Sequence, residues 1–397
     1  MNKIYFDHAA TSPVKKEVIE TMKPYFDKVY GNPSSVHFFG QEARKAVEES
    51  REKVAEFLNC TPEEIVFTSG GTEADNLALR GIINYQTSII KQKPHLITSV
   101  IEHHAILHTC QDLEKKELAQ VSYLPVDKWG QVSVSDVKKA IKENTVLVSI
   151  MYANNEIGTI QPIKEIGKLI LNIKNKKSKI VFHTDAVQAI EYLNCDVNYL
   201  GVDLLSLSAH KFGGPKGVGA LFIRKNTGIT PRITGGEQEN KMRAGTENVP
   251  GIVGLGKAIQ ELRNKNDESR IKKIQQLRDK LIDGIMRKIR DVILTGHPEN
   301  RLPNSASFCF KYIEGESILI SLDLEGVAVA TGSACTSSIY EPSHVLLASG
   351  IKPEVAQGSI RITLGEQNTK EEVEYLLKTL PPIVKRLRKM SPLNKKG

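Results

Sequence analysis

Three side chains with acid–base or nucleophilic chemistry each follow a strand-like apolar run. Lys211 lies three residues beyond "DLLSLS", and the loss of hydration at the end of a buried strand favours its neutral amine, a Schiff-base nucleophile. Asp185 follows "KIVFHT", where a buried carboxylate can pair with a protonated ring nitrogen. His103 follows "HLITSVI" after one residue, and its flat ring can stack on a planar ligand.

A fourth motif is suited to phosphate. Gly70-Gly71-Thr72 follows the run "EIVFTS" and opens a helix-like segment, so free backbone N–H groups, a hydroxyl and the helix dipole meet there. Phosphate cradle, ring-nitrogen carboxylate, stacking histidine and reactive lysine together describe a pyridoxal-phosphate site. A dinucleotide cofactor would need Gly-x-Gly-x-x-Gly after a first strand, which is absent. Taken singly, each residue also has a structural interpretation as a turn, a cap or a polar core residue.

Cys335 is the candidate sulfur nucleophile. It lies within "TGSACTSS", a small polar segment, although free cysteines are among the most buried residues of soluble proteins. A thiolate in a loop can reach into a pocket and swing out again. The alternative is a stray loop thiol. The other four cysteines, at positions 60, 110, 195 and 309, are far apart, and we expect reduced thiols with neither a disulfide framework nor a zinc site.

Strand-like runs alternate with helix-like segments over residues 60–225, which predicts βαβ units and a largely parallel sheet. The seven runs are 64–69, 95–101, 121–126, 145–152, 179–184, 203–208 and 219–224. Five of them end in polar motifs. Ligands of open α/β sheets bind beyond the carboxyl ends of the strands, so we expect one ligand crevice there.

The pattern of expected strands and helices divides the chain into three parts. We predict an α/β protein with an N-terminal arm (1–15) packing on the small domain, a large cofactor-binding domain (16–260) and a smaller α+β C-terminal domain (261–397). The last helix should begin at a capping box formed by Thr369 and Glu372. The C-terminal domain carries Cys335.

Charge and hydropathy limit the kinds of partner that we expect the protein to bind. The net charge is +8, but most of the excess lies in the C-terminal tail from residue 376 onward, so we do not expect direct nucleic-acid binding. That tail is interpreted as a solvated helix end, with a docking patch for an acidic partner as the alternative. No run approaches 18 apolar residues and no secretory signal is recognised, so we expect a cytoplasmic protein without a membrane span.

Motifs spread over residues 4–367 resemble one family closely. They are "YFDHAAT", "YGNPSSVHFFG", "FTSGGTEADN", "NNEIGTIQPI", "HTDAVQA", "SAHKFGGPKGVGAL", "RAGTENVPGIVG", "EGESILI", "GSACTSS", "EPSHVL" and "SIRITLG". The chain resembles the cysteine desulfurases of the NifS/IscS type, within the class V aminotransferases. The resemblance implies a pyridoxal-phosphate enzyme of fold type I with a large and a small domain, and a homodimer.

The resemblance also assigns roles to residues. It implies that Lys211 carries the cofactor, that His103 also shuttles protons, and that Cys335 takes the sulfur. It implies that Arg361 binds the substrate carboxylate with help from Asn155 on the substrate side. The implied cofactor contacts are Gly71, Thr72, His103, Asn155, Asp185, Gln188, Ser208, His210, Lys211 and, from the neighbouring subunit, Thr246.

The function implied is removal of sulfur from L-cysteine. Its products would be L-alanine and a persulfide on Cys335, which is passed to an iron–sulfur cluster scaffold or another acceptor. No resident metal is expected, although Cys335 could serve as a transient iron–sulfur ligand shared with the scaffold. Selenocysteine lyase and aminotransferase activity are alternatives on the same scaffold, and a non-catalytic assembly module is an alternative of another class.

Overall fold

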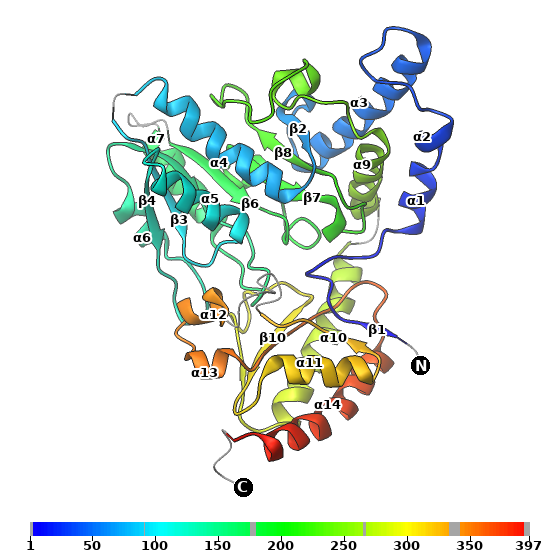
Figure 1. Cartoon of the computed structure of the whole chain (residues 1–397), viewed down its shortest axis with the longest axis vertical. Coiled ribbons are helices and arrows are strands. Elements are labelled where there is room, and N and C mark those ends of the chain that lie inside the picture. The colour runs from blue at the N-terminus through cyan, green and yellow to red at the C-terminus, as the bar shows by residue number, and fades with distance from the viewer. Residues whose placement is uncertain (1–2, 91, 175–179, 265–266, 333–341, 393–397) are drawn as a thin grey trace.

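A seven-stranded sheet forms the centre of the larger part of the molecule (Figure 1). The computed structural model describes residues 3–90, 92–174, 180–264, 267–332 and 342–392. The strands are β2 (Ile65–Thr68), β3 (His95–Ser99), β4 (Gln120–Leu124), β5 (Thr145–Ser149), β6 (Val181–Asp185), β7 (Leu204–Ser208) and β8 (Gly219–Ile223). Each overlaps one of the seven predicted runs; β4 begins one residue before its run, and β6 ends one residue after its run.

The order of these strands is β2-β8-β7-β6-β5-β3-β4. The two pairs that include β8 are antiparallel, and the other four pairs are parallel. The prediction of a mostly parallel seven-stranded sheet is therefore confirmed. Because β8 runs against both of its neighbours, β2 and β7 point the same way and their carboxyl ends lie at the same edge.

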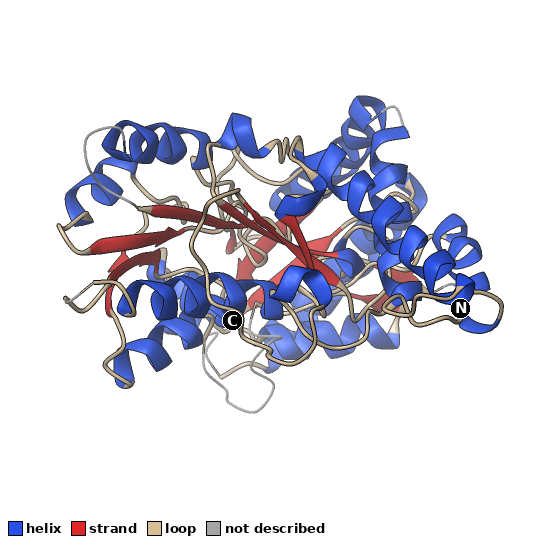
Figure 2. Cartoon of the chain, turned by 90° about the horizontal axis from the view of Figure 1, so that it is seen from above, coloured by secondary structure: helices blue, strands red, loops and turns tan. Residues whose placement is uncertain are grey.

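Helices cover both faces of this sheet, which Figure 2 shows as a layer of strands between helices. They are α1 (Lys16–Met22), α3 (Phe38–Leu58), α4 (Gly71–Thr87), α5 (His104–Lys115), α6 (Val134–Ala140), α7 (Ile163–Lys174), α8 (Val197–Leu200) and α9 (Val249–Asn264). Alternate strand residues enter different cores: Val66 and Leu147 pack with α4 and α5, whereas Phe67 and Val148 pack with α3, α7 and α9. Two buried faces explain the near-continuous apolar runs.

A second, antiparallel sheet lies in the lower part of Figure 1. Its order is β12 (Ser359–Thr363), β10 (Ser305–Phe310) and β9 (Val292–Leu294). The helices of this part are α10 (Asp267–Lys288), α11 (Gly315–Leu324), α12 (His344–Ala348), α13 (Pro353–Ala356) and α14 (Lys370–Met390). The predicted capping box is confirmed at the start of α14, where Thr369 and Glu372 exchange hydrogen bonds.

The N-terminal segment joins the two parts. Strand β1 (Ile4–Tyr5) pairs in parallel with β11 (Val327–Ala328), and Phe6 is fully buried in the core of the second sheet. The chain then crosses to the first sheet, where Ser12 N donates to the His210 carbonyl and Lys15 N to that of Gly213. None of the helices in the described part of the chain has the length and apolarity to cross a bilayer.

A buried ion pair ties the loop after β8 to the first sheet. The Arg51 guanidinium on α3 donates to both carboxylate oxygens of Glu239, at 2.7 and 2.9 Å. Glu239 also accepts from the Phe67 backbone N–H at 2.8 Å. Both side chains are almost fully buried, whereas Glu48, the other carboxylate on Arg51, is 47% exposed.

We predict that Glu239→Ala lowers the free energy of unfolding by about 3 kcal/mol, because it leaves a buried guanidinium without its counter-charge. The matched change Glu48→Ala removes a solvent-screened partner of the same arginine and should cost about 0.5 kcal/mol. Equilibrium denaturation of both variants measures the difference. Equal losses would contradict the importance of the buried pair.

Candidate active site at the carboxyl ends of the strands

The strand ends bring the predicted polar residues to one edge of the sheet. Asp185 is the last residue of β6 and Ser208 the last of β7, and Lys211 ends a short 3₁₀ turn directly after β7. His103 is the N-cap of α5, four residues beyond the end of β3. Parallel strands point these ends the same way, so the residues share one edge of the sheet.

The glycine turn before α4 has the form of an anion cradle. Gly70 has φ 151°, and a Cβ there would lie 3.7 Å from the Ser208 Oγ. A Cβ on Gly71 would approach Val187 Cγ2 to 2.7 Å, so the backbone packs where a side chain does not fit. α4 begins at Gly71 and runs for 17 residues, which directs free N–H groups and the positive helix end toward Ser208. Thr72 is exposed in the first turn.

Lys211 lies just beyond the end of β7 at this edge of the sheet, and it is half-buried. Its Nζ donates to the carbonyl oxygens of Ala9 and Ala10, at 2.6 and 2.9 Å. Its positive charge acts on the nearby Asp185 and His103. The N-terminal segment thus holds the lysine close enough for its charge to lower the pKa of both the Asp185 carboxyl and the His103 imidazole.

Burial dominates the acid–base properties of the two neighbours. It raises the pKa of Asp185 to about 6, against the opposing effects of the Val187 N–H, which donates to its Oδ1 at 2.9 Å, and of Lys211. It lowers the pKa of His103 to about 4, and the charge of Lys211 acts in the same direction. His103 Nδ1 accepts from the Ala105 N–H at 3.1 Å, which leaves the proton of the neutral ring on Nε2.

Arg361 and Gln188 reach the same region but contact the N-terminal segment. Arg361, on β12, donates from Nη2 to Asp7 Oδ1 at 2.7 Å and from Nη1 to the Asn155 carbonyl at 3.2 Å. Gln188 Nε2 donates to the Ala9 carbonyl at 3.0 Å.

Three further predicted site residues are His210, Thr246 and Cys335. His210 Nδ1 is 3.1 Å from the Thr11 hydroxyl, and burial lowers the pKa of His210 to about 4. Thr246 is exposed in the loop before α9. Cys335 lies outside the described residues.

Comparison with known proteins identifies the family. The model of the class V aminotransferases matches residues 4–376. A cysteine desulfurase IscS of Dictyoglomus turgidum is 53% identical over 390 residues, which cover 98% of this chain and 96% of that protein. A cysteine desulfurase IscS of Methanosarcina thermophila is 52% identical over 393 residues, 99% of this chain and 95% of that one. The chain belongs to the cysteine desulfurases of the class V aminotransferase family.

Solved structures agree with this family and with fold type I. A NifS-like protein superimposes with a TM-score of 0.89 at 40% identity, over 97% of this chain and all of that one. A structure of SspA in complex with cysteine gives a TM-score of 0.80 at 36% identity, over 93% of this chain and 100% of that one. The architecture of the desulfurase is thus that of a fold type I pyridoxal-phosphate enzyme.

Sequence reasoning missed a buried carboxyl beside the site. Glu102, the residue before His103, is 1% exposed, and it accepts from the Ser99 hydroxyl at 2.6 Å and from the Met151 N–H at 3.0 Å. Burial raises its pKa to about 8. A signal was present, because Glu102 stands between the end of an apolar run and a candidate catalytic histidine.

Asp7 was missed as well. Its carboxylate contacts Arg361, but only the position of Asp7 within "YFDHAAT" marked the segment, and no periodicity could connect residue 7 with residue 361.

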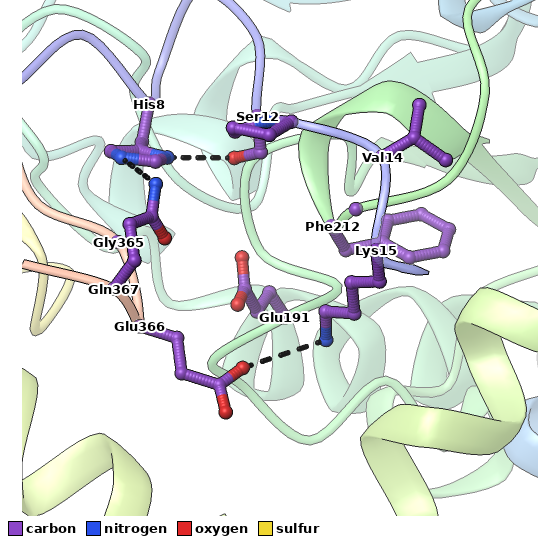
Figure 3. Close-up of a pocket in the computed structure, with 11 residues that line it drawn as sticks. His8, Ser12, Val14, Lys15, Glu191, Phe212, Gly365, Glu366 and Gln367 are labelled. Atoms are coloured by element: carbon purple, nitrogen blue, oxygen red, sulfur yellow. Dashed lines mark hydrogen bonds and ion pairs between the residues drawn. The ribbon is translucent and has the colours of Figure 1, made fainter. Parts of the chain in front are cut away.

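The N-terminal segment lines one side of a pocket of about 480 Å³ (Figure 3). His8 contacts Ser12 at 3.0 Å and the Gln367 side chain at 2.8 Å, and Lys15 lies 3.8 Å from the Glu366 carboxylate. Neighbouring side chains of the segment thus point to different sites: Asp7 contacts Arg361, whereas His8 lines the pocket.

We predict that Glu102→Gln changes how stability depends on pH. Between pH 4.5, the ordinary carboxyl pKa, and about pH 8, folded Glu102 keeps a proton that the unfolded chain releases. The bound proton therefore contributes to the free energy of unfolding; this contribution is fully present below pH 4.5 and is lost as the pH rises through the folded pKa of about 8. The variant, which mimics the neutral acid, should therefore gain on the order of 2 kcal/mol relative to wild type between about pH 5.5 and 7.5.

Chemical denaturation at both pH values measures this change. Glu114→Gln is the matched control on the neighbouring helix, because Glu114 is exposed to solvent. Parallel pH profiles of Glu102→Gln and wild type would contradict a neutral Glu102.

Proposed function

We propose that the protein is a pyridoxal-phosphate-dependent cysteine desulfurase. It converts L-cysteine to L-alanine and leaves the sulfur as a persulfide on Cys335. The observation that carries the proposal is the convergence of Lys211, Asp185 and His103 with the glycine turn of α4, in a chain more than half identical to an IscS desulfurase. The names of the relatives favour this activity over selenocysteine lyase or aminotransferase activity.

The residues at the sheet edge fit the proposed cofactor. Its phosphate would lie at Gly71, Thr72, Ser208 and His210, where backbone N–H groups and the helix dipole favour an anion. His103 would stack on its ring, and Asp185, whose buried carboxyl suits a protonated ring nitrogen, would pair with that nitrogen. Asn155 and Gln188 complete the proposed set.

Each protein group has a distinct task in the proposed reaction. When bound, pyridoxal phosphate supplies a sink for the electron pair released at the substrate α-carbon. Lys211 removes the α-proton as its neutral amine, and Arg361 holds the substrate carboxylate with its planar guanidinium. His103 is neutral at physiological pH, because burial lowers its pKa to about 4, and it can take up a proton during turnover only where Nδ1 gives up its hydrogen bond from the Ala105 N–H.

The sulfur transfer uses Cys335 as a thiolate. Its sulfur attacks the sulfur of the substrate, a sulfur–sulfur bond forms, and the bond from sulfur to the substrate β-carbon breaks. The electron pair of the broken bond stays with the carbon side, which takes up protons and leaves as L-alanine. The persulfide then passes to an iron–sulfur scaffold or another acceptor, and Cys335 can serve there as a transient iron–sulfur ligand.

The proposal includes an assembly and a location. The protein acts in the cytoplasm as a homodimer in which Thr246 of each subunit completes the phosphate site of the other. Its arm is residues 1–15, its cofactor domain 16–260 and its small domain 261–397. Support comes from the exposed position of Thr246 on its loop and from the unpaired cysteines at positions 60, 110, 195 and 309.

We predict that the protein gains one sulfur atom, on Cys335, when the cofactor-loaded form is treated with L-cysteine. Mass spectrometry of the intact chain and its peptides locates the atom. Cys335→Ser should bind cofactor and substrate but form no alanine, since a serine hydroxyl stays protonated at neutral pH. Lys211→Ala should bind cofactor without a covalent link. Undiminished alanine production by Cys335→Ser would refute the assignment of the nucleophile.

We predict that inactive subunits complement one another. In a mixed dimer of Lys211→Ala and Thr246→Val chains, one site receives Lys211 from one subunit and Thr246 from the other, so mixing should restore activity above that of either variant. Unfolding and refolding a mixture, followed by an activity assay, tests this. If Thr246 acts within its own subunit, mixing restores nothing.

A further inference from the structure

Arg361 is a buried cation with unused bonding capacity. Its side chain is 4% exposed, and among the described residues it makes single hydrogen bonds from Nη2 to Asp7 and from Nη1 to the Asn155 carbonyl. The buried Nε of Arg361 has no hydrogen-bond acceptor among the described residues. A guanidinium edge that holds a carboxylate through two parallel bonds would use Nε together with Nη2.

Asp7 holds that guanidinium by one oxygen, and its side chain is partly exposed to solvent. Its backbone is fixed, because the Asp7 carbonyl accepts from the Tyr5 hydroxyl at 3.0 Å and from the Ala10 N–H at 3.1 Å. Its side chain is 20% exposed, five times the fraction of Arg361. A side-chain rotation can therefore return the Asp7 carboxylate to water, whereas Arg361 cannot follow it.

We propose that Asp7 is an internal stand-in for the substrate carboxylate. This rests on the proposed function, which assigns the substrate carboxylate to Arg361. In the empty site Asp7 neutralises Arg361. When substrate binds, its carboxylate takes Nη2 and the unused Nε, and Asp7 turns to solvent.

The exchange makes Asp7 a specificity-determining residue. A ligand with a carboxylate replaces one anion by another and adds the hydrogen bond to Nε. A ligand without a carboxylate leaves Asp7 on Arg361. If such a ligand displaced Asp7, the buried Arg361 guanidinium would be left without a counter-charge, which is costly. The competition also weakens binding of the true substrate, because only the fraction of molecules in which Asp7 has moved away can accept it.

Asp7→Asn tests the proposal, because it keeps the shape and removes the competing charge. We expect the KM for L-cysteine and the Kd for L-alanine, measured by calorimetry, to fall about five-fold. The melting temperature without ligand should fall, and the stabilisation by L-alanine should increase. Unchanged or raised KM and Kd values would overturn the proposal, since a residue that only orients Arg361 would weaken binding when it is changed.

Two controls separate this inference from the proposed function. Cysteamine is L-cysteine without its carboxylate, so its binding should not tighten in Asp7→Asn; equal tightening for both ligands would overturn the exchange. If Arg361→Gln binds L-alanine as tightly as wild type, the assignment of Arg361 fails, and with it this part of the proposed function. If Arg361 is needed but Asp7→Asn has no effect, only the role of Asp7 fails.

A structure of the wild-type protein with L-alanine gives an answer even if Asp7→Asn does not fold. We expect the ligand carboxylate on Nε and Nη2 of Arg361, with Asp7 turned away. An Asp7 carboxylate that still accepts from Nη2 while L-alanine is bound would overturn the proposal.

Discussion

Parallel strands deliver their carboxyl ends to one edge of a sheet, and the candidate site depends on this constraint. Apolar packing on both faces fixes the strands, with Val66 directed to one helix layer and Phe67 to the other. Whatever follows each strand that points the same way is then placed at the common edge. Lys211 and His103 need only follow a strand end within a few residues, and Asp185 is itself the last residue of its strand.

The cationic side chains near that edge need hydrogen-bond acceptors that the sheet does not offer, because the backbone carbonyls of the strands are already paired with neighbouring strands. The N-terminal segment supplies what is missing. The carbonyls of Ala9 and Ala10 accept from Lys211, and the carboxylate of Asp7 accepts from Arg361. Ten residues at the start of the chain thus provide acceptors for two cations that come from different sheets.

The larger sheet could be predicted because its signal is local. Each strand is an apolar run of ordinary length, and the helices between the runs require parallel pairing. The roles proposed for Lys211, Asp185 and His103 remain predictions, although their places beyond strand ends followed from those runs. The contact between Asp7 and Arg361 could not be predicted, because it joins residues 354 positions apart through a segment without periodicity. The buried state of Glu102 depends on Ser99, the last residue of β3, and on Met151, two residues beyond the end of β5.

The pairing of β1 with β11 limits how far the length of the N-terminal segment can change. Loops ordinarily accept insertions and deletions. Here the irregular stretch from Asp7 to Ser12 is pinned at one end by the strand pair and at the other by the His210 carbonyl. A deletion of one residue would bring His8 or Phe6 opposite Arg361 in place of a carboxylate. The number of residues in this irregular stretch therefore determines which side chain lies opposite Arg361, so its length matters to the site as much as its side chains do.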